Sequence, residues 1–125
     1  MDIFPNRFAF PRVDELLDVE YQRIPPLPPG FHENDGGISF RLKADAAPIA
    51  AGEFINLELR FTYQNAVRDA RCTARCERLL GDSEQNGERV GVFRFINASP
   101  ETVEAIRSMA CLHLLRLNRE AASGF

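Results

Sequence analysis

The alternation of apolar and polar residues between Phe54 and Tyr63, the cleanest in the chain, constrains the fold more than any other feature of this sequence. Its apolar face consists of Ile55, Leu57, Leu59, Phe61 and Tyr63, and its polar face of Asn56, Glu58, Arg60 and Thr62. A period of two matches a β-strand, whose side chains point alternately to the two faces of a sheet. The stretch therefore predicts a strand in an antiparallel sheet with one wet face.

Four further segments predict strands, because they alternate in the same way or are almost continuously apolar. They are residues 16–24, 37–43, 70–79 and 89–96. Small residues occupy the apolar face of 70–79, as suits the crowded interior of a small barrel. The segment 89–96 is apolar on both faces, which predicts a strand covered on both sides. Strand-rich chains of this size must protect their sheet edges, and closure into a barrel is the usual solution.

Proline and glycine mark the connections between these strands. The proline-rich segment 25–30 is expected to form an ordered loop or a sheet edge, because proline lacks an amide donor. Residues 44–52 break the alternation, and the polar segment 81–88 is typical of a hairpin turn. We expect an extended N-terminal arm over residues 1–14, a barrel domain with its helix over 15–120, and a tail over 121–125.

The last segment predicts the only helix, from Pro100 to about Arg119, with Ser99 as its N-cap. Helical spacing places one apolar stripe against the sheet: Val103, Ile106, Ala110, Leu114 and Leu117. Leu112 and Leu115 project elsewhere. They indicate either a surface for a partner or a second copy, or an additional contact with the core.

Composition indicates a globular protein with a single core. The chain has 125 residues, of which 45% are hydrophobic and 26% charged. A net charge of −3 argues against binding to a nucleic-acid duplex, which requires many cations to neutralise phosphates. Neither a membrane-spanning run nor a signal peptide is visible, so a cytoplasmic location without membrane insertion is expected. The three cysteines fit reduced thiols.

No pattern of catalytic residues stands out. There is no glycine-rich loop before a helix and no nucleophile elbow, so the sequence predicts a protein that is not an enzyme. Cys72 and Cys76 share one face of a predicted strand, but Cys111, His32 and His113 lack the spacing of a zinc site. We therefore expect buried, reduced cysteines, and no metal or cofactor.

Four segments in order resemble a PilZ domain: GGISF, PIAAGEFINLEL, ARCTARCERL and ERVGVFRFINASPETVEAI. The resemblance covers about residues 36–115. It implies a six-stranded antiparallel β-barrel with a C-terminal helix. It also implies binding of cyclic di-GMP, and relay of that signal to a protein partner in motility, secretion or biofilm control.

The two ligand motifs of that family are present only in altered form. The family's RxxxR pair corresponds to Arg7 and Arg12, which are spaced one residue further apart. The family's [DN]xSxxG motif aligns with His32, Asn34 and Gly37, of which only the glycine is retained. Arginine guanidinium groups bind phosphates through forked hydrogen bonds and stack on guanine. A histidine, as at residue 32, cannot reproduce a carboxylate.

Three functions remain open from the sequence. The first is a receptor for cyclic di-GMP with a non-standard site. The second is an adaptor that no longer binds the nucleotide and acts through Phe4, Phe8, Phe10, Leu112 and Leu115. The third is a small barrel that binds another ligand in an internal cavity. The oligomeric state, monomer or homodimer, is also open.

Overall fold

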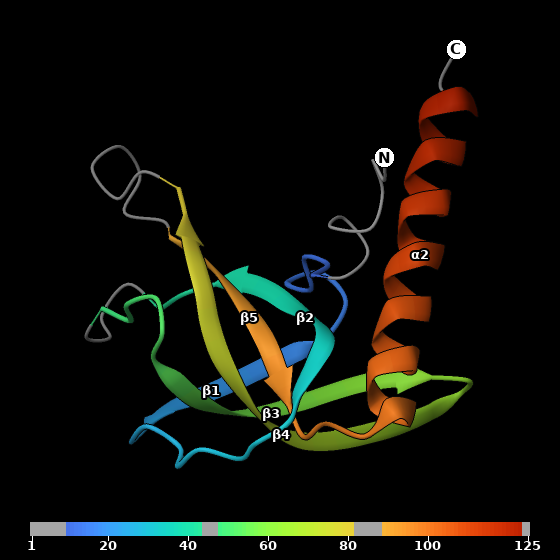
Figure 1. Ribbon diagram of the computed structural model, residues 1–125. Helices are drawn as coiled ribbons and strands as arrows, with labels where there is room; N and C mark the ends of the chain where they lie inside the picture. Colours follow the sequence, from blue (N-terminus) through green and yellow to red (C-terminus); the bar gives the residue numbers. More distant parts are fainter. Residues whose placement is uncertain (1–9, 44–47, 82–88, 124–125) are drawn as a thin grey trace.

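The computed structural model describes residues 10–43, 48–81 and 89–123, with side chains up to residue 117. It contains β1 (Asp18–Ile24), β2 (Glu33–Arg41), β3 (Phe54–Tyr63), β4 (Ala66–Leu80), β5 (Val90–Ile96) and α2 (Pro100–Ser123). The fold is mostly β with one C-terminal helix, as the sequence predicts (Figure 1). Phe4, Arg7 and Phe8, and all but the first residue of the expected turn 81–88, lie outside the described residues.

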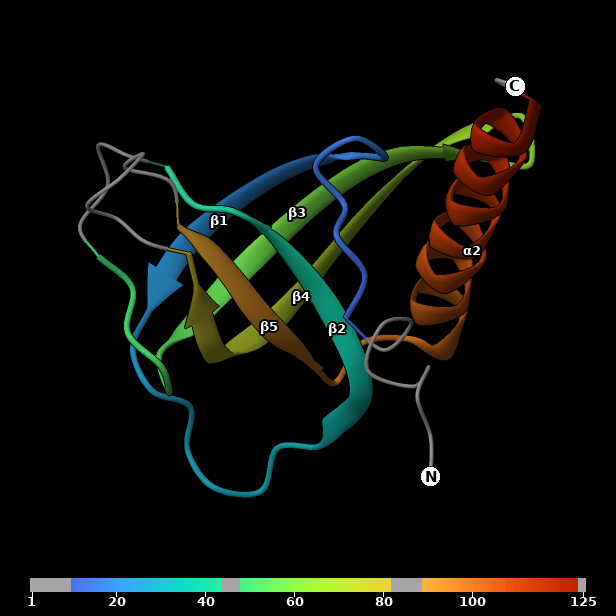
Figure 2. The same ribbon diagram turned by 90° about the horizontal axis from the view of Figure 1, so that it is seen from above.

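The sheet is antiparallel, in the order β1-β3-β4-β5-β2. The prediction of a six-stranded closed barrel is wrong for the described residues, which form five strands whose edges, β1 and β2, do not pair with each other. The sheet is strongly curled but open (Figure 2). It stays open because the N-terminal segment, which forms a parallel bridge from Arg12 to Ser39, occupies the β2 edge where a barrel would place another strand.

Main-chain amides on the outer edge of β2 and just beyond it are satisfied by residues 11–21. The Ser39 amide donates to the Pro11 carbonyl over 2.9 Å. The Arg41 amide donates to the Asp14 carboxylate over 2.9 Å, and the Lys43 amide donates to the Tyr21 hydroxyl over 2.8 Å. An exposed strand edge is a template for unwanted pairing, so these partners protect β2 without a sixth strand.

Alternation on β3 places its side chains as predicted. Ile55, Leu57, Leu59 and Phe61 are buried, whereas Asn56, Glu58, Arg60 and Thr62 are exposed. β5 is covered on both sides, as expected, with Val92, Phe93, Phe95 and Ile96 all buried. Inside the curl the rings of Phe40 and Phe93 stack with centroids 4.9 Å apart, an offset geometry that adds to the gain from burial.

The helix α2 begins as the sequence predicts. The Ser99 hydroxyl accepts a hydrogen bond from the Thr102 amide over 3.2 Å, so Ser99 is the N-cap. Ile106 and Ala110 are buried, but Leu117, the last member of the predicted stripe, is 46% exposed. Figure 1 shows why: α2 continues to Ser123, and its C-terminal half rises beyond the sheet. Within the described ranges, no helix is long and apolar enough to cross a membrane.

Close packing against β5 explains why residue 37 is a glycine. A Cβ atom built on Gly37 would lie 1.7 Å from the carbonyl oxygen of Phe93, a main-chain atom that cannot move aside. The register of β2 on β5 also shifts between Glu33 and Gly37, which indicates a bulge. Gly37 is therefore required by the sheet itself.

We expect Gly37→Ala to lower the free energy of unfolding by about 3 kcal/mol, because the added methyl group overpacks the β2–β5 interface. The matched control is Gly52→Ala. Gly52 has a φ of +93° but open space around the new Cβ, so backbone strain alone should cost about 1 kcal/mol. Urea unfolding of the two variants measures the difference. Equal losses would contradict the packing argument.

Candidate binding site

Two residues that the sequence suggests as ligands, His32 and Asn34, hold the link between β5 and α2. The Asn34 side chain donates to the Ala98 carbonyl over 3.2 Å and accepts from the Ala98 amide over 3.0 Å. His32 uses its main chain: its amide donates to the Asn97 side chain over 3.0 Å, and its carbonyl accepts from the Asn97 amide over 2.8 Å. These contacts fix the start of α2, so the polar groups of Asn34 are already occupied by the protein.

Arg94 joins the start of β2 to the N-terminal segment. Its guanidinium donates to the Asn34 carbonyl over 2.9 Å and to the Glu77 carboxylate over 2.6 Å. The same group lies over the ring of Phe10, 5.0 Å from its centroid, in a cation–π contact. Sequence reasoning did not assign Arg94 a role. The available signal was a single arginine inside a strand that is otherwise apolar on both faces.

A small ion-pair network surrounds Arg94 on the face of β2, β4 and β5. Glu77 also contacts Arg75 over 3.2 Å, and Arg75 contacts Glu33 over 2.6 Å. Arg75, Glu77 and Arg94 are partly buried and Glu33 is exposed. Dissolved salt screens the partly buried charges less than it would screen fully exposed ones. The network holds Arg94 in place and leaves its charge balanced by carboxylates.

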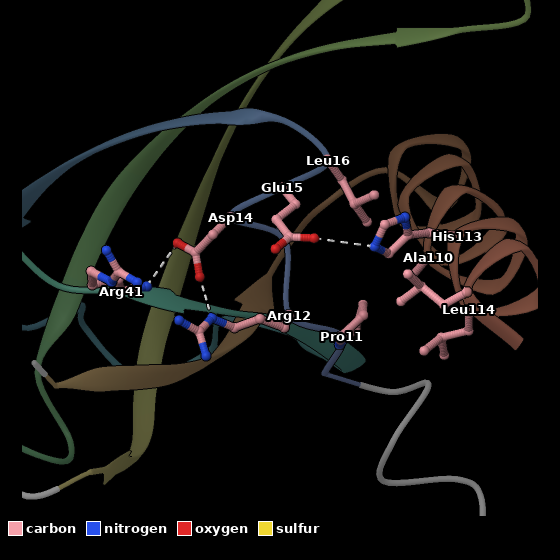
Figure 3. A pocket seen from close by; sticks show the side chains of 10 residues that line it. Pro11, Arg12, Asp14, Glu15, Leu16, Arg41, Ala110, His113 and Leu114 are labelled. Carbon is pink, nitrogen blue, oxygen red and sulfur yellow. Dashed lines mark hydrogen bonds and ion pairs between the residues drawn. The ribbon is translucent and has the colours of Figure 1, made fainter. Parts of the chain in front are cut away.

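Arg12 is the one member of the predicted arginine pair that the structure describes. Its guanidinium forms an ion pair with the neighbouring Asp14. The main chain of Arg12 lies beside Ser39, two residues beyond Gly37, and its side chain points away from α2, toward Asp14 and Arg41 (Figure 3). Arg12 thus lies beside β2, the strand that contains Asn34. The two side chains contact different groups, Asp14 for Arg12 and Ala98 for Asn34.

A groove of about 790 Å³ separates the N-terminal segment from α2, and we call it the α2 groove (Figure 3). It is lined by Pro11, Arg12, Asp14, Glu15, Leu16 and Arg41 on one side, and by Ala110, His113, Leu114 and Leu117 on the other. The His113 imidazole bridges the two sides, with its Nε2 atom 3.4 Å from the Glu15 carboxylate. The groove combines an aliphatic helix wall with charges that are already paired.

A second hollow of about 720 Å³ lies over β1, β3 and β4 and the end of β2. Charged side chains dominate its lining, and they pair with one another: Lys43 with Glu20, Arg60 with Asp69 and Arg71 with Glu58. Exposed pairs of this kind solubilise a sheet face and contribute little to stability. The α2 groove is therefore the stronger candidate for binding.

The predicted partner residues have different surroundings. Phe10 is half-buried against Arg94, whereas Leu112 and Leu115 on α2 are exposed.

Burial raises the pKa of the Cys72 thiol to about 12 and also raises that of Cys76, so both thiols stay protonated at neutral pH. Within the described part of the chain, no cluster of histidine, cysteine and carboxylate side chains forms a metal site.

Comparisons with protein-family models, with curated proteins and with solved structures found no match for this chain.

Because both polar atoms of the Asn34 amide serve the β5–α2 link, replacing Asn34 by serine should destabilise the protein. We expect Asn34→Ser to lower the free energy of unfolding by about 1–3 kcal/mol, since the shorter side chain leaves the Ala98 main chain unpaired. The matched control is Asn56→Ser on the exposed face of β3, expected to change stability by less than about 0.5 kcal/mol. Chemical denaturation compares them. Unchanged stability in Asn34→Ser would show that residue 34 has no structural role.

Proposed function

We propose that this chain is a non-enzymatic, PilZ-like adaptor that no longer uses the nucleotide motif and binds a protein partner through the α2 groove. The observation that carries the proposal is the double hydrogen bond between Asn34 and Ala98. A dinucleotide at the motif would have to displace contacts that fix the start of α2. Gly37 supports the same proposal, because packing against Phe93 already explains why residue 37 is a glycine.

The chemistry of the groove favours an aliphatic segment of a partner protein. Leu114 and Leu117 form an apolar wall, and Leu16 faces them from the N-terminal segment. The charges of Arg12 and Asp14 are paired with each other on one side of the groove, so an anionic ligand would have to replace Asp14. Apolar side chains need no such replacement, and their burial is the main source of binding energy in protein interfaces.

The second candidate is a receptor for cyclic di-GMP with a non-standard site. One observation favours it: the Arg12 side chain is 48% exposed, and an exposed ion pair is worth about 1 kcal/mol or less. A phosphate that forms a forked hydrogen bond with the guanidinium would compete with Asp14. Arg7, the other predicted arginine, lies outside the described residues.

Titration with cyclic di-GMP separates the two candidates. We expect no saturable heat at high-micromolar ligand in isothermal calorimetry, and no change of that result in Arg7→Ala or Arg12→Ala. A saturable signal in the unmodified chain that either arginine variant abolishes would replace the adaptor proposal with the receptor. Thermal unfolding with and without the dinucleotide checks the result independently, because a ligand that binds the folded state raises its melting temperature.

Capture of the partner tests the groove directly. Leu117→Glu places a charge on the apolar wall at an exposed position, so the fold should survive while affinity for the partner falls at least about tenfold. The matched control is Leu80→Glu, at an equally exposed site at the end of β4, far from α2 (Figure 1). The protein captured by the unmodified chain is identified and its affinity measured with purified components. Unchanged binding in Leu117→Glu, or equal loss in Leu80→Glu, would contradict a groove site.

A further inference from the structure

The side of α2 that points away from the α2 groove carries a second set of exposed residues, which we call the outward face. It consists of Glu101, Glu104, Cys111, Leu112, Leu115 and Arg116, with the partly buried Ser108 among them. Successive helix residues are rotated by about 100°, so the centre of this face lies half a turn from the groove residues Ala110 and Leu114. A molecule bound to one face therefore leaves the other free.

Two leucines dominate the middle of the outward face. Leu112 is 54% exposed and Leu115 is 55% exposed, on the half of the helix that rises beyond the sheet. Cys111 beside them is also exposed. Within the part of the chain that the structure describes, nothing covers these leucines. Single exposed leucines are ordinary, but adjacent ones at helical spacing form a stripe of the kind that pairs helices.

Charges flank the leucines in a fixed order along the helix axis. Glu101 and Glu104 lie at the N-terminal end of the face, and Arg116 lies at its C-terminal end, all exposed. A parallel pair of such helices would place each acidic residue beside its own copy. An antiparallel pair places acidic ends beside basic ends, so the face is complementary to itself only in that orientation.

We propose that the outward face of α2 binds the same face of a second copy, with the two helices antiparallel about a twofold axis. When Leu112 of one copy packs beside Ser108 of the other, the rise of about 1.5 Å per residue brings Arg116 level with Glu104 of the second copy. Glu101 of that copy is then within one turn. The four leucines lose water together at the centre, and the α2 groove of each copy stays open. This dimer does not depend on the proposed partner.

Sedimentation equilibrium of the full chain over a range of concentrations tests the dimer. The average mass should rise from 14.1 kDa toward twice that value. Replacing both leucines, Leu112→Glu with Leu115→Glu, should raise the dissociation constant at least about tenfold, because the centre of the contact becomes charged. Leu80→Glu and Leu117→Glu should leave it unchanged. A mass of 14.1 kDa at all concentrations, or equal dimerisation by the double variant, would overturn the proposal.

Charge reversal tests the orientation. Arg116→Glu alone should weaken the antiparallel dimer, and adding Glu101→Arg and Glu104→Arg in the same chain should restore it. Raising the salt concentration should weaken the unmodified dimer, since exposed charge pairs are screened. A parallel dimer behaves differently, because like charges face each other before and after each reversal. An unchanged dissociation constant in Arg116→Glu, or a dimer strengthened by salt, would overturn the antiparallel arrangement.

Discussion

The arrangement of the molecule depends on how the outer edge of β2 is satisfied. A curled sheet of five strands leaves two edges, and unpaired amides on an edge are costly when buried and hazardous when exposed. Here Pro11, Asp14 and Tyr21 accept from three amides at and just beyond β2, at alternating positions. The N-terminal segment therefore lies along β2 and opposite α2, and the space between that segment and the helix is the α2 groove.

Contacts within the protein also occupy Arg12 and Asn34, two residues that the sequence suggests as ligands. Once the N-terminal segment lies along β2, Arg12 is held beside Ser39 and pairs with Asp14. Asn34, at the start of the same strand, faces the β5–α2 link and supplies both its donor and its acceptor to Ala98. Internal hydrogen bonds thus account for Asn34, and close packing against Phe93 accounts for Gly37, two residues that in the sequence suggest a ligand. A buried polar group that already has its partners gains little from a new one.

Local patterns predicted much of the fold. The bounds of β3, the two covered faces of β5 and the Ser99 cap all follow from side chains within a few residues of one another. The predicted strand begins at residue 37, whereas β2 begins at Glu33, because a bulge between Glu33 and Gly37 lets the strand start earlier. The helix extends past Arg119 to Ser123, since no strong helix breaker follows that arginine before the glycine at residue 124.

What the sequence did not reveal depends on pairs of residues far apart in the chain. The contact of Asn34 with Ala98 and that of Arg94 with Phe10 require the β2–β5 register, which periodicity does not specify. Closure of the barrel was predicted from the general need to protect sheet edges. On β2 the edge amides are satisfied by side chains and by a short N-terminal segment in place of another strand. Periodicity shows that an edge must be protected, and only the three-dimensional arrangement shows which residues protect it.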